Sequence, residues 1–118
     1  MEFGIFNSLY TPHQALEGRD PAVVMHERLM NEVDWTIAAD KAGFKYTWAT
    51  EHHFLTQYSH LSANEVFLPY VAARTEQIHL GTGIFNITPP VNHPARVAER
   101  VAMLDHLSGG RFEFGVGR

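Results

Sequence analysis

The sequence predicts an α/β fold, the first four strands and three helices of a parallel β/α (TIM-type) barrel. Strand-like and helix-like segments alternate as β-α-β-α-β-α-β along the 118 residues, an order typical of parallel strands joined by right-handed crossovers. Every connection that leaves a strand is long and polar, whereas connections that leave helices are short and contain Gly or Thr. Because neither the first nor the third strand is followed by Gly-x-Gly-x-x-Gly opening a helix, a doubly wound dinucleotide-binding sheet is disfavoured.

The first strand is predicted at residues 1–6, where apolar residues alternate around Gly4. Asp20-Pro21 predicts a helix start, since aspartate caps free N–H groups and proline at the first position loses no hydrogen bond. Gly43 predicts its left-handed stop. The buried face of this helix is predicted to consist of Leu29, Met30, Val33, Ile37 and Ala38.

The second strand is predicted to begin at Phe44 and to end in Glu51-His52-His53. Ser62-Ala63-Asn64-Glu65 matches a capping box and predicts a helix that continues through Arg74. Pro69 within it predicts a kink or a split.

The third strand is predicted at residues 78–85, and residues 86–92 form a long loop. The third helix is predicted to begin with Pro94 in its first turn and to end at residues 108–110, before a fourth strand at 111–116. Its buried stripe is predicted to be Val97, Val101, Leu104 and Leu107.

Composition is that of an ordinary globular protein, with 45% hydrophobic and 19% charged residues. The net charge of −4 argues against nucleic acid or an anionic membrane as a partner. The absence of cysteine excludes disulfides and a thiolate nucleophile and agrees with a cytoplasmic location. Neither a signal peptide nor a membrane-spanning run is predicted.

Length sets a further expectation. A complete barrel needs about 250 residues, so residues 1–118 are expected to be the amino-terminal half of one barrel domain. The first and fourth strands would otherwise be bare apolar edges. We therefore expect more chain, or another copy in a homo-oligomer, to cover the open side.

Glu51-His52-His53 is the predicted catalytic segment, because it places ionisable side chains at the carboxyl end of a strand. Strand alternation puts His52 on one side and Glu51 and His53 on the other. A metal site is disfavoured, since adjacent strand residues diverge and no Cys or carboxylate cluster completes a ligand set. A surface or merely structural role is the remaining alternative.

Two further features each leave two interpretations open. Residues 81–84, Gly-Thr-Gly-Ile, allow the backbone to approach a flat ligand, or they mark a bulge or barrel bend. Arg118 is suited to a bidentate phosphate contact, or it is a solvated surface residue. His26 and His106 are predicted to lie on the surface, and His13 and His60 in the long loops.

Several motifs together resemble the bacterial luciferase-like flavin monooxygenases, nearly from end to end of the chain. The motifs are Met1-x-Phe3-Gly4-x-Phe6, Ala42-Gly43-Phe44, Trp48-x-x-Glu51-His52-His53-Phe54, Gly81-Thr82, His93-Pro94-x-Arg96-x-Ala98-Glu99 and Leu104-Asp105-x-Leu107-Ser108-x-Gly110-Arg111-Phe112-x-Phe114-Gly115.

The resemblance implies reduced FMN as cofactor and O2 as co-substrate, with oxygen attacking the flavin C4a and a small organic molecule as substrate. It gives His52 an acid/base role, with Glu51 beside it, and places Phe6 in the pocket. It places Gly83-Ile84, which can form a non-prolyl cis peptide, against the isoalloxazine ring, and Arg118 on the FMN phosphate. A flavin reductase is the implied source of reduced FMN.

Departures from the family pattern leave the substrate open. Gly117 stands where the luciferase catalytic subunit has a reactive cysteine, and residues 87–92 form a longer loop, so light emission is not implied. Residues 1–118 alone are expected to bind flavin weakly and to be inactive. The alternatives are a deazaflavin-dependent hydride-transferring oxidoreductase of the same fold and a non-catalytic flavin-binding or assembly protein.

Overall fold

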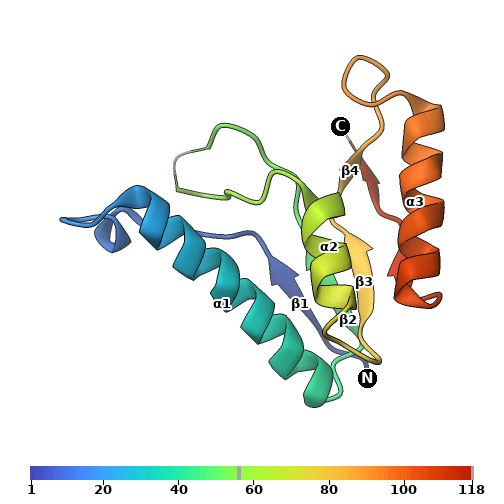
Figure 1. Cartoon of the computed structure of the whole chain (residues 1–118), viewed down its shortest axis with the longest axis horizontal. Helices are drawn as coiled ribbons and strands as arrows, with labels where there is room; N and C mark the ends of the chain where they lie inside the picture. Colours follow the sequence, from blue (N-terminus) through green and yellow to red (C-terminus); the bar gives the residue numbers. More distant parts are fainter. Residues whose placement is uncertain (56, 118) are drawn as a thin grey trace.

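A four-stranded parallel sheet organises the molecule in the computed structural model, which describes residues 1–55 and 57–117 (Figure 1). Its strands lie in the order β1-β2-β3-β5, and a separate parallel pair joins β4 to β6. The strands are β1 (Gly4–Asn7), β2 (Tyr46–Ala49), β3 (His79–Thr82), β4 (Phe85–Asn86), β5 (Phe112–Glu113) and β6 (Val116–Gly117). The helices are η1 (His13–Ala15), α1 (Pro21–Lys41), α2 (Asn64–Ala72) and α3 (Pro94–Ser108).

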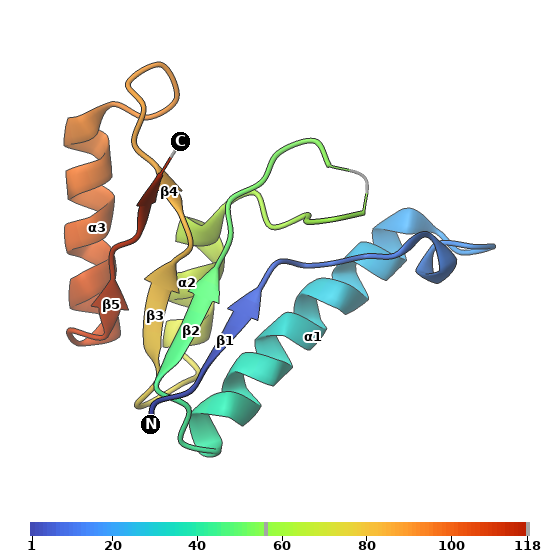
Figure 2. The ribbon, with the colours of Figure 1, turned by 180° about the vertical axis from the view of Figure 1, so that it is seen from behind.

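The three α-helices lie on the same side of the sheet. Figure 1 shows them in front of the strands, and Figure 2, from behind, shows the strands in front of the helices. A doubly wound sheet carries helices on both faces, whereas a β/α barrel keeps them all outside. The predicted barrel-type α/β architecture is therefore confirmed. No helix in the described ranges is long and apolar enough to cross a membrane.

The third and fourth predicted strands are each divided in two, which the sequence did not predict. The Thr82 hydroxyl donates to the Gly115 carbonyl at 2.8 Å and accepts from the Gly115 N–H at 2.9 Å. This side chain replaces ladder bonds where β3 ends, and the chain then pairs again as β4 with β6. The first strand begins at Gly4, three residues later than predicted.

Helix α1 begins as predicted, with the Asp20 carboxylate accepting from the Ala22 N–H at 2.9 Å. Val33 is buried as expected, but Ala38 is exposed. The buried face of α1 instead contains three polar residues that the apolar pattern could not identify, and these are Glu32, Thr36 and Asp40.

Helix α2 differs from the sequence prediction in its N-cap and in its continuity through Pro69. Its N-cap is Ala63, which makes no side-chain cap bond, so the predicted capping box does not form. Pro69 lies inside the helix, which continues to Ala72. Proline removes one backbone donor there, while Leu68 and Val71 are fully buried on either side of it. Burial of this face offsets the lost hydrogen bond.

Helix α3 begins after His93, whose Nδ1 accepts from the Ala95 N–H at 3.2 Å, and ends at the left-handed Gly109. Val97 and Leu104 are buried as predicted, but Leu107 is 65% exposed. Ser108 takes the buried position one turn after Leu104, because residues four apart lie on the same helical face.

Asp40 anchors the end of α1 to the loop that enters β3. Its Oδ2 accepts from the Glu76 N–H at 3.0 Å, and its Oδ1 accepts from Gln77 at 3.0 Å and Ile78 at 2.7 Å. Burial by itself would raise the pKa of Asp40, but these three donors and the nearby Arg111 charge lower it overall. The carboxylate is therefore held ionised in the folded protein.

Arg111 performs a similar task between α2, α3 and β3. Its guanidinium donates to the carbonyls of Ser108, Ile78, Ala72 and Thr75 and to the Thr75 hydroxyl, at 2.8 to 3.2 Å. All five partners belong to helix ends, a strand start or the link between them. Arg111 thus satisfies carbonyls that the helices cannot satisfy themselves.

Glu32 is a buried carboxyl group with one backbone partner, the Leu9 N–H at 3.1 Å. Burial raises the pKa of Glu32, and the Leu9 hydrogen bond only partly opposes this. The folded state therefore holds the proton more tightly than the unfolded state. Stability conferred by protonated Glu32 is present below its unfolded pKa and is lost as the pH rises through its folded pKa.

We expect Glu32→Gln to raise stability at pH 7 to 8, because glutamine keeps the acceptor for Leu9 and carries no charge. Each pKa unit between the folded and unfolded states corresponds to about 1.4 kcal/mol. Urea unfolding between pH 4 and 8 should show the gain shrinking toward acid pH. Glu17→Gln, at an exposed position, is the matched control, and a gain independent of pH would contradict the interpretation.

Candidate functional site

The candidate site lies where β1, β2 and β3 end, at one edge of the parallel sheet (Figure 2). In parallel α/β folds this edge carries ligand-binding residues. Phe6 lies near the end of β1, residues 51–53 follow β2, and Gly83 and Ile84 follow β3. The structure thus brings the ends of three predicted segments to one edge.

An exposed aromatic ring and a bare stretch of backbone form one wall of this site. Phe6 is 64% exposed, and it pairs in register with Trp48. A Cβ built on Gly83 would lie 3.2 Å from Phe6 Cε2 and 3.5 Å from Trp48 Cβ. Phe6 and Gly83 are therefore neighbours, and the absence of a side chain at residue 83 lets the half-buried backbone lie close to the aromatic ring.

At Gly81, two residues earlier, the absent side chain makes room for another residue of this chain. A Cβ there would lie 2.2 Å from Trp48 Cε3, so the indole of Trp48 occupies that space itself. The strand also ends at Thr82. The bend interpretation of residues 81–84 therefore describes the backbone. Gly83 is half-buried, and the Phe6 ring borders the position that a side chain at residue 83 would need.

Glu51 connects the end of β2 to β4. Its Oε2 accepts from the Asn86 N–H at 2.9 Å, and its Oε1 lies 3.0 Å from His53 Nε2. The Glu51 side chain is 8% exposed, whereas that of His53 is 48% exposed. The predicted strand end was wrong, because β2 ends at Ala49 and residues 51–53 lie beyond it. The contact between Glu51 and His53 therefore does not follow from strand alternation. Both oxygens of Glu51 are engaged, so its observed contacts position the backbone and His53.

His52 faces the loop that follows β2. Its N–H donates to the Leu61 carbonyl at 2.9 Å, and its ring meets Tyr58 edge-on, with centroids 5.4 Å apart. Its Nδ1 is buried and has no hydrogen-bond partner among the described residues. The ring borders a hollow of about 330 Å³ that Ser59 and His60 also line. An imidazole with an unpartnered nitrogen can hold or move one proton.

Ile84 is the other predicted cofactor residue whose contacts the structure defines. The Gly83–Ile84 peptide bond is cis, the geometry that the resemblance implies for this position. The Gly83 N–H donates to the Ala49 carbonyl at 2.7 Å, and the Ile84 carbonyl accepts from Asn64 Nδ2 at 2.7 Å. Arg118, predicted to contact a phosphate, lies outside the described residues.

Two residues at this site were not identified from the sequence as site residues. Tyr58 lies between the second predicted strand and the helix after it, and Asn64 lies within the predicted capping box. Their contacts are with residues 6 and 20 positions away. No local pattern in the sequence could have indicated them.

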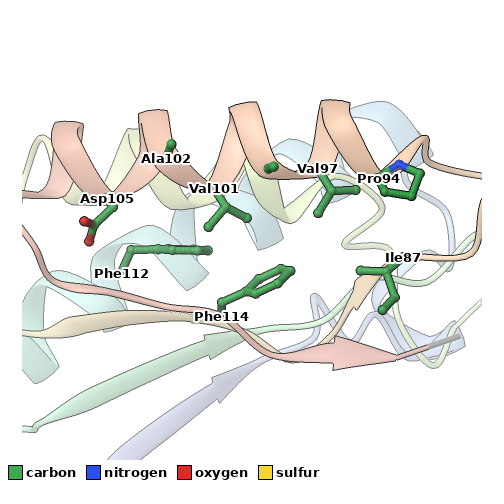
Figure 3. Close-up of a pocket in the computed structure, with 9 residues that line it drawn as sticks. Ile87, Pro94, Val97, Val101, Ala102, Asp105, Phe112 and Phe114 are labelled. Atoms are coloured by element: carbon green, nitrogen blue, oxygen red, sulfur yellow. The ribbon is translucent and has the colours of Figure 1, made fainter.

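A larger hollow lies elsewhere, between α3 and the strand β5 (Figure 3). Its volume is about 600 Å³, and Asp105 is its only acidic lining residue. Phe112 and Phe114 point toward α3 in this view. The remaining lining residues are Ile87, Pro94, Val97, Ala98, Val101 and Ala102.

The residues at the candidate site are consistent with a flat, partly apolar cofactor. The half-buried Gly83 backbone beside the exposed Phe6 ring offers a contact surface, and His52 has a buried Nδ1 without a hydrogen-bond partner among the described residues. Over residues 1–55 and 57–117, no group of three or more His, Cys, Asp or Glu residues is arranged to hold a metal ion.

Comparison with known proteins gives a consistent result. A family model described as luciferase-like monooxygenase matches residues 1–118. The 4-hydroxyprotoasukamycin monooxygenase of Streptomyces nodosus subsp. asukaensis is 38% identical, over 99% of this chain and 29% of its own length. The solved monooxygenase RslO1 from Streptomyces bottropensis is 30% identical with a TM-score of 0.80, over 100% of this chain and 33% of its own.

More distant solved structures share the fold. The oxygenating constituent of 3,6-diketocamphane monooxygenase from Pseudomonas putida, in complex with FMN, has a TM-score of 0.80 at 21% identity, over 99% of this chain and 29% of its own. An F420-dependent secondary alcohol dehydrogenase has a TM-score of 0.72 at 23% identity, over 98% of this chain and 31% of its own. The chain thus spans about a third of the length of the proteins it matches.

Proposed function

The chain belongs to the luciferase-like monooxygenase family, and from this premise we propose that it forms the amino-terminal part of an FMN-dependent monooxygenase acting on a small organic molecule. The observation that carries the proposal is the half-buried Gly83 backbone in close contact with the exposed Phe6 ring. Such a surface suits one face of an isoalloxazine ring. Bound in reduced form, FMN would supply the electrons that activate O2.

The chain's own residues would then do three things. Phe6 and Trp48 would keep water from the flavin face, since both present aromatic surface on the same side of the sheet. His52 would hold or deliver one proton through Nδ1, its unpartnered atom. Glu51 would fix the Asn86 backbone and the His53 ring. Arg118 is proposed for the FMN phosphate from the family resemblance alone.

A deazaflavin-dependent oxidoreductase is the second candidate, because the fold is shared with an F420-dependent secondary alcohol dehydrogenase. The Gly83 backbone and the exposed Phe6 ring would accommodate either tricyclic cofactor. The two candidates differ in their need for oxygen, since hydride transfer uses none.

The deciding experiment titrates the full-length protein anaerobically with reduced FMN and, separately, with the reduced deazaflavin. We expect binding of reduced FMN, followed on aeration by O2 consumption and an oxygenated product. Hydride transfer with the deazaflavin in the absence of O2 would overturn the proposal. So would FMN binding with neither O2 consumption nor product formation across a panel of small apolar substrates, the result expected of a flavin-storing or assembly protein.

We also propose a separate flavin reductase as the source of reduced FMN, and a homo-oligomeric, cytoplasmic protein. No flavin-reducing residue is proposed in this chain. Turnover should therefore require either added reductase with NAD(P)H or chemically reduced FMN, and turnover with NAD(P)H and oxidised FMN alone would contradict this.

A further inference from the structure

Asn64 is fully buried at the first position of α2, yet it does not cap the helix. Ala63 occupies the N-cap position without a side-chain bond. The Asn64 side chain instead reaches across to the ends of β2 and β3. Its Nδ2 donates to the Ile84 carbonyl at 2.7 Å and lies 3.5 Å from the Ala49 carbonyl.

The orientation of this amide is determined by its partner. A carbonyl oxygen can only accept, so the atom facing Ile84 must be the NH2 group. The Asn64 Oδ1 is then buried without a hydrogen-bond partner among the described residues. A buried acceptor without a partner is costly. The Asn64 Nδ2 therefore donates to the Ile84 carbonyl even though the Asn64 Oδ1 is left buried without a partner among the described residues.

Asn64 contacts the segment of residues 83–86, which contains Gly83 and borders Phe6 at the site. Side chains hold its backbone at three points, with Asn64 on the Ile84 carbonyl, Glu51 on the Asn86 N–H at 2.9 Å and Asn92 on the Asn86 carbonyl. The backbone holds it at Gly83, which donates to Ala49, and at Phe85, which donates to Gly115 at 2.8 Å. Asn64 is thus the side chain that fixes the carbonyl next to Gly83.

We propose that Asn64 is a positioning residue, which holds the Gly83–Ile84 backbone in place as the contact surface for the flavin ring. This inference rests on the proposed function. Asn64 does not touch the reacting atoms in this scheme, and it acts through the Ile84 carbonyl.

The test compares Asn64→Leu with wild type in the full-length protein, by FMN titration with fluorescence and visible circular dichroism and by thermal unfolding. Leucine removes the unpartnered acceptor but also leaves the Ile84 carbonyl without its donor, so the melting temperature should fall moderately while the protein stays folded. The Kd for FMN should rise about tenfold, the equivalent of one lost hydrogen bond. The visible circular dichroism of bound FMN should also change.

Asn64→Asp provides the second variant if Asn64→Leu does not fold. Its ionised carboxylate would repel the Ile84 carbonyl, whereas its protonated form can donate to it. FMN affinity relative to wild type should therefore recover as the pH is lowered. Asn92→Leu is the matched control, because Asn92 Nδ2 donates to the Asn86 carbonyl at the same 2.7 Å.

The possible results separate the two proposals. If wild type does not bind FMN, the proposed function fails. If wild type binds FMN but a folded Asn64→Leu or Asn64→Asp binds it with unchanged Kd and dichroism, the role of Asn64 is refuted. An equal loss of affinity in Asn92→Leu would also refute it, because the effect would then belong to β4 in general.

Discussion

Replacement of His52 by alanine is expected to lower substrate oxygenation by about 10²- to 10⁴-fold, the usual contribution of a positioned acid/base group. Its Nδ1 is buried and unpartnered among the described residues, and its ring is held against Tyr58. Reduced FMN should still bind, because the proposed ring contacts come from Phe6 and Gly83. The measurement is kcat for product formation in the full-length protein, beside the Kd for FMN.

The matched control for that variant is His106→Ala, which removes an exposed imidazole on α3. It should leave both kcat and the Kd for FMN unchanged. His52→Ala with wild-type turnover would eliminate the proton-handling role. A large loss of FMN affinity with an unchanged kcat would instead assign His52 to cofactor binding.

Replacement of Asp40 by asparagine is expected to destabilise the protein by about 2–4 kcal/mol, the range for a buried charge-assisted network that loses its acceptor. Three backbone N–H groups converge on the two carboxylate oxygens. An amide has only one oxygen, so its NH2 group would face at least one of these donors. Urea unfolding at pH 7 would measure the loss, and Asp34→Asn, exposed on the same helix, is its control.

The Asp40 effect should also depend on pH. Its pKa is lowered in the folded state, so the stability it contributes is present above the unfolded carboxyl pKa and is lost as the pH falls through the folded pKa. The difference between wild type and Asp40→Asn should therefore shrink in acid. A difference that stays constant from pH 7 to pH 3 would contradict the ionised anchor.

Local signals predicted the order and type of the elements well. Asp20-Pro21 begins α1, and Gly109 ends α3 in the left-handed conformation. These signals act within a few residues of where they appear in the sequence, so they can be identified without knowledge of the fold. The candidate site segments after β1, β2 and β3 are predicted for a similar reason, since strand ends in parallel folds meet at one edge.

The errors concern contacts between distant parts of the chain. Asn64 resembles a member of a capping box, but its partner is Ile84, twenty positions later. Leu107 continues the apolar stripe by spacing, yet Ser108 is the residue that faces the sheet side. The division of β3 from β4 depends on the Thr82 hydroxyl and Gly115, 33 positions apart. Propensity and periodicity contain no information about such pairs.

The five hydrogen bonds of Arg111 have a consequence for the diversification of this fold. They join two helix ends to a strand start on the outer side of the sheet, and none involves Phe6, His52 or Gly83. A change of substrate or of tricyclic cofactor therefore requires no change in the hydrogen bonds of Arg111. Chemistry at the strand tips can change freely while one guanidinium keeps the scaffold assembled.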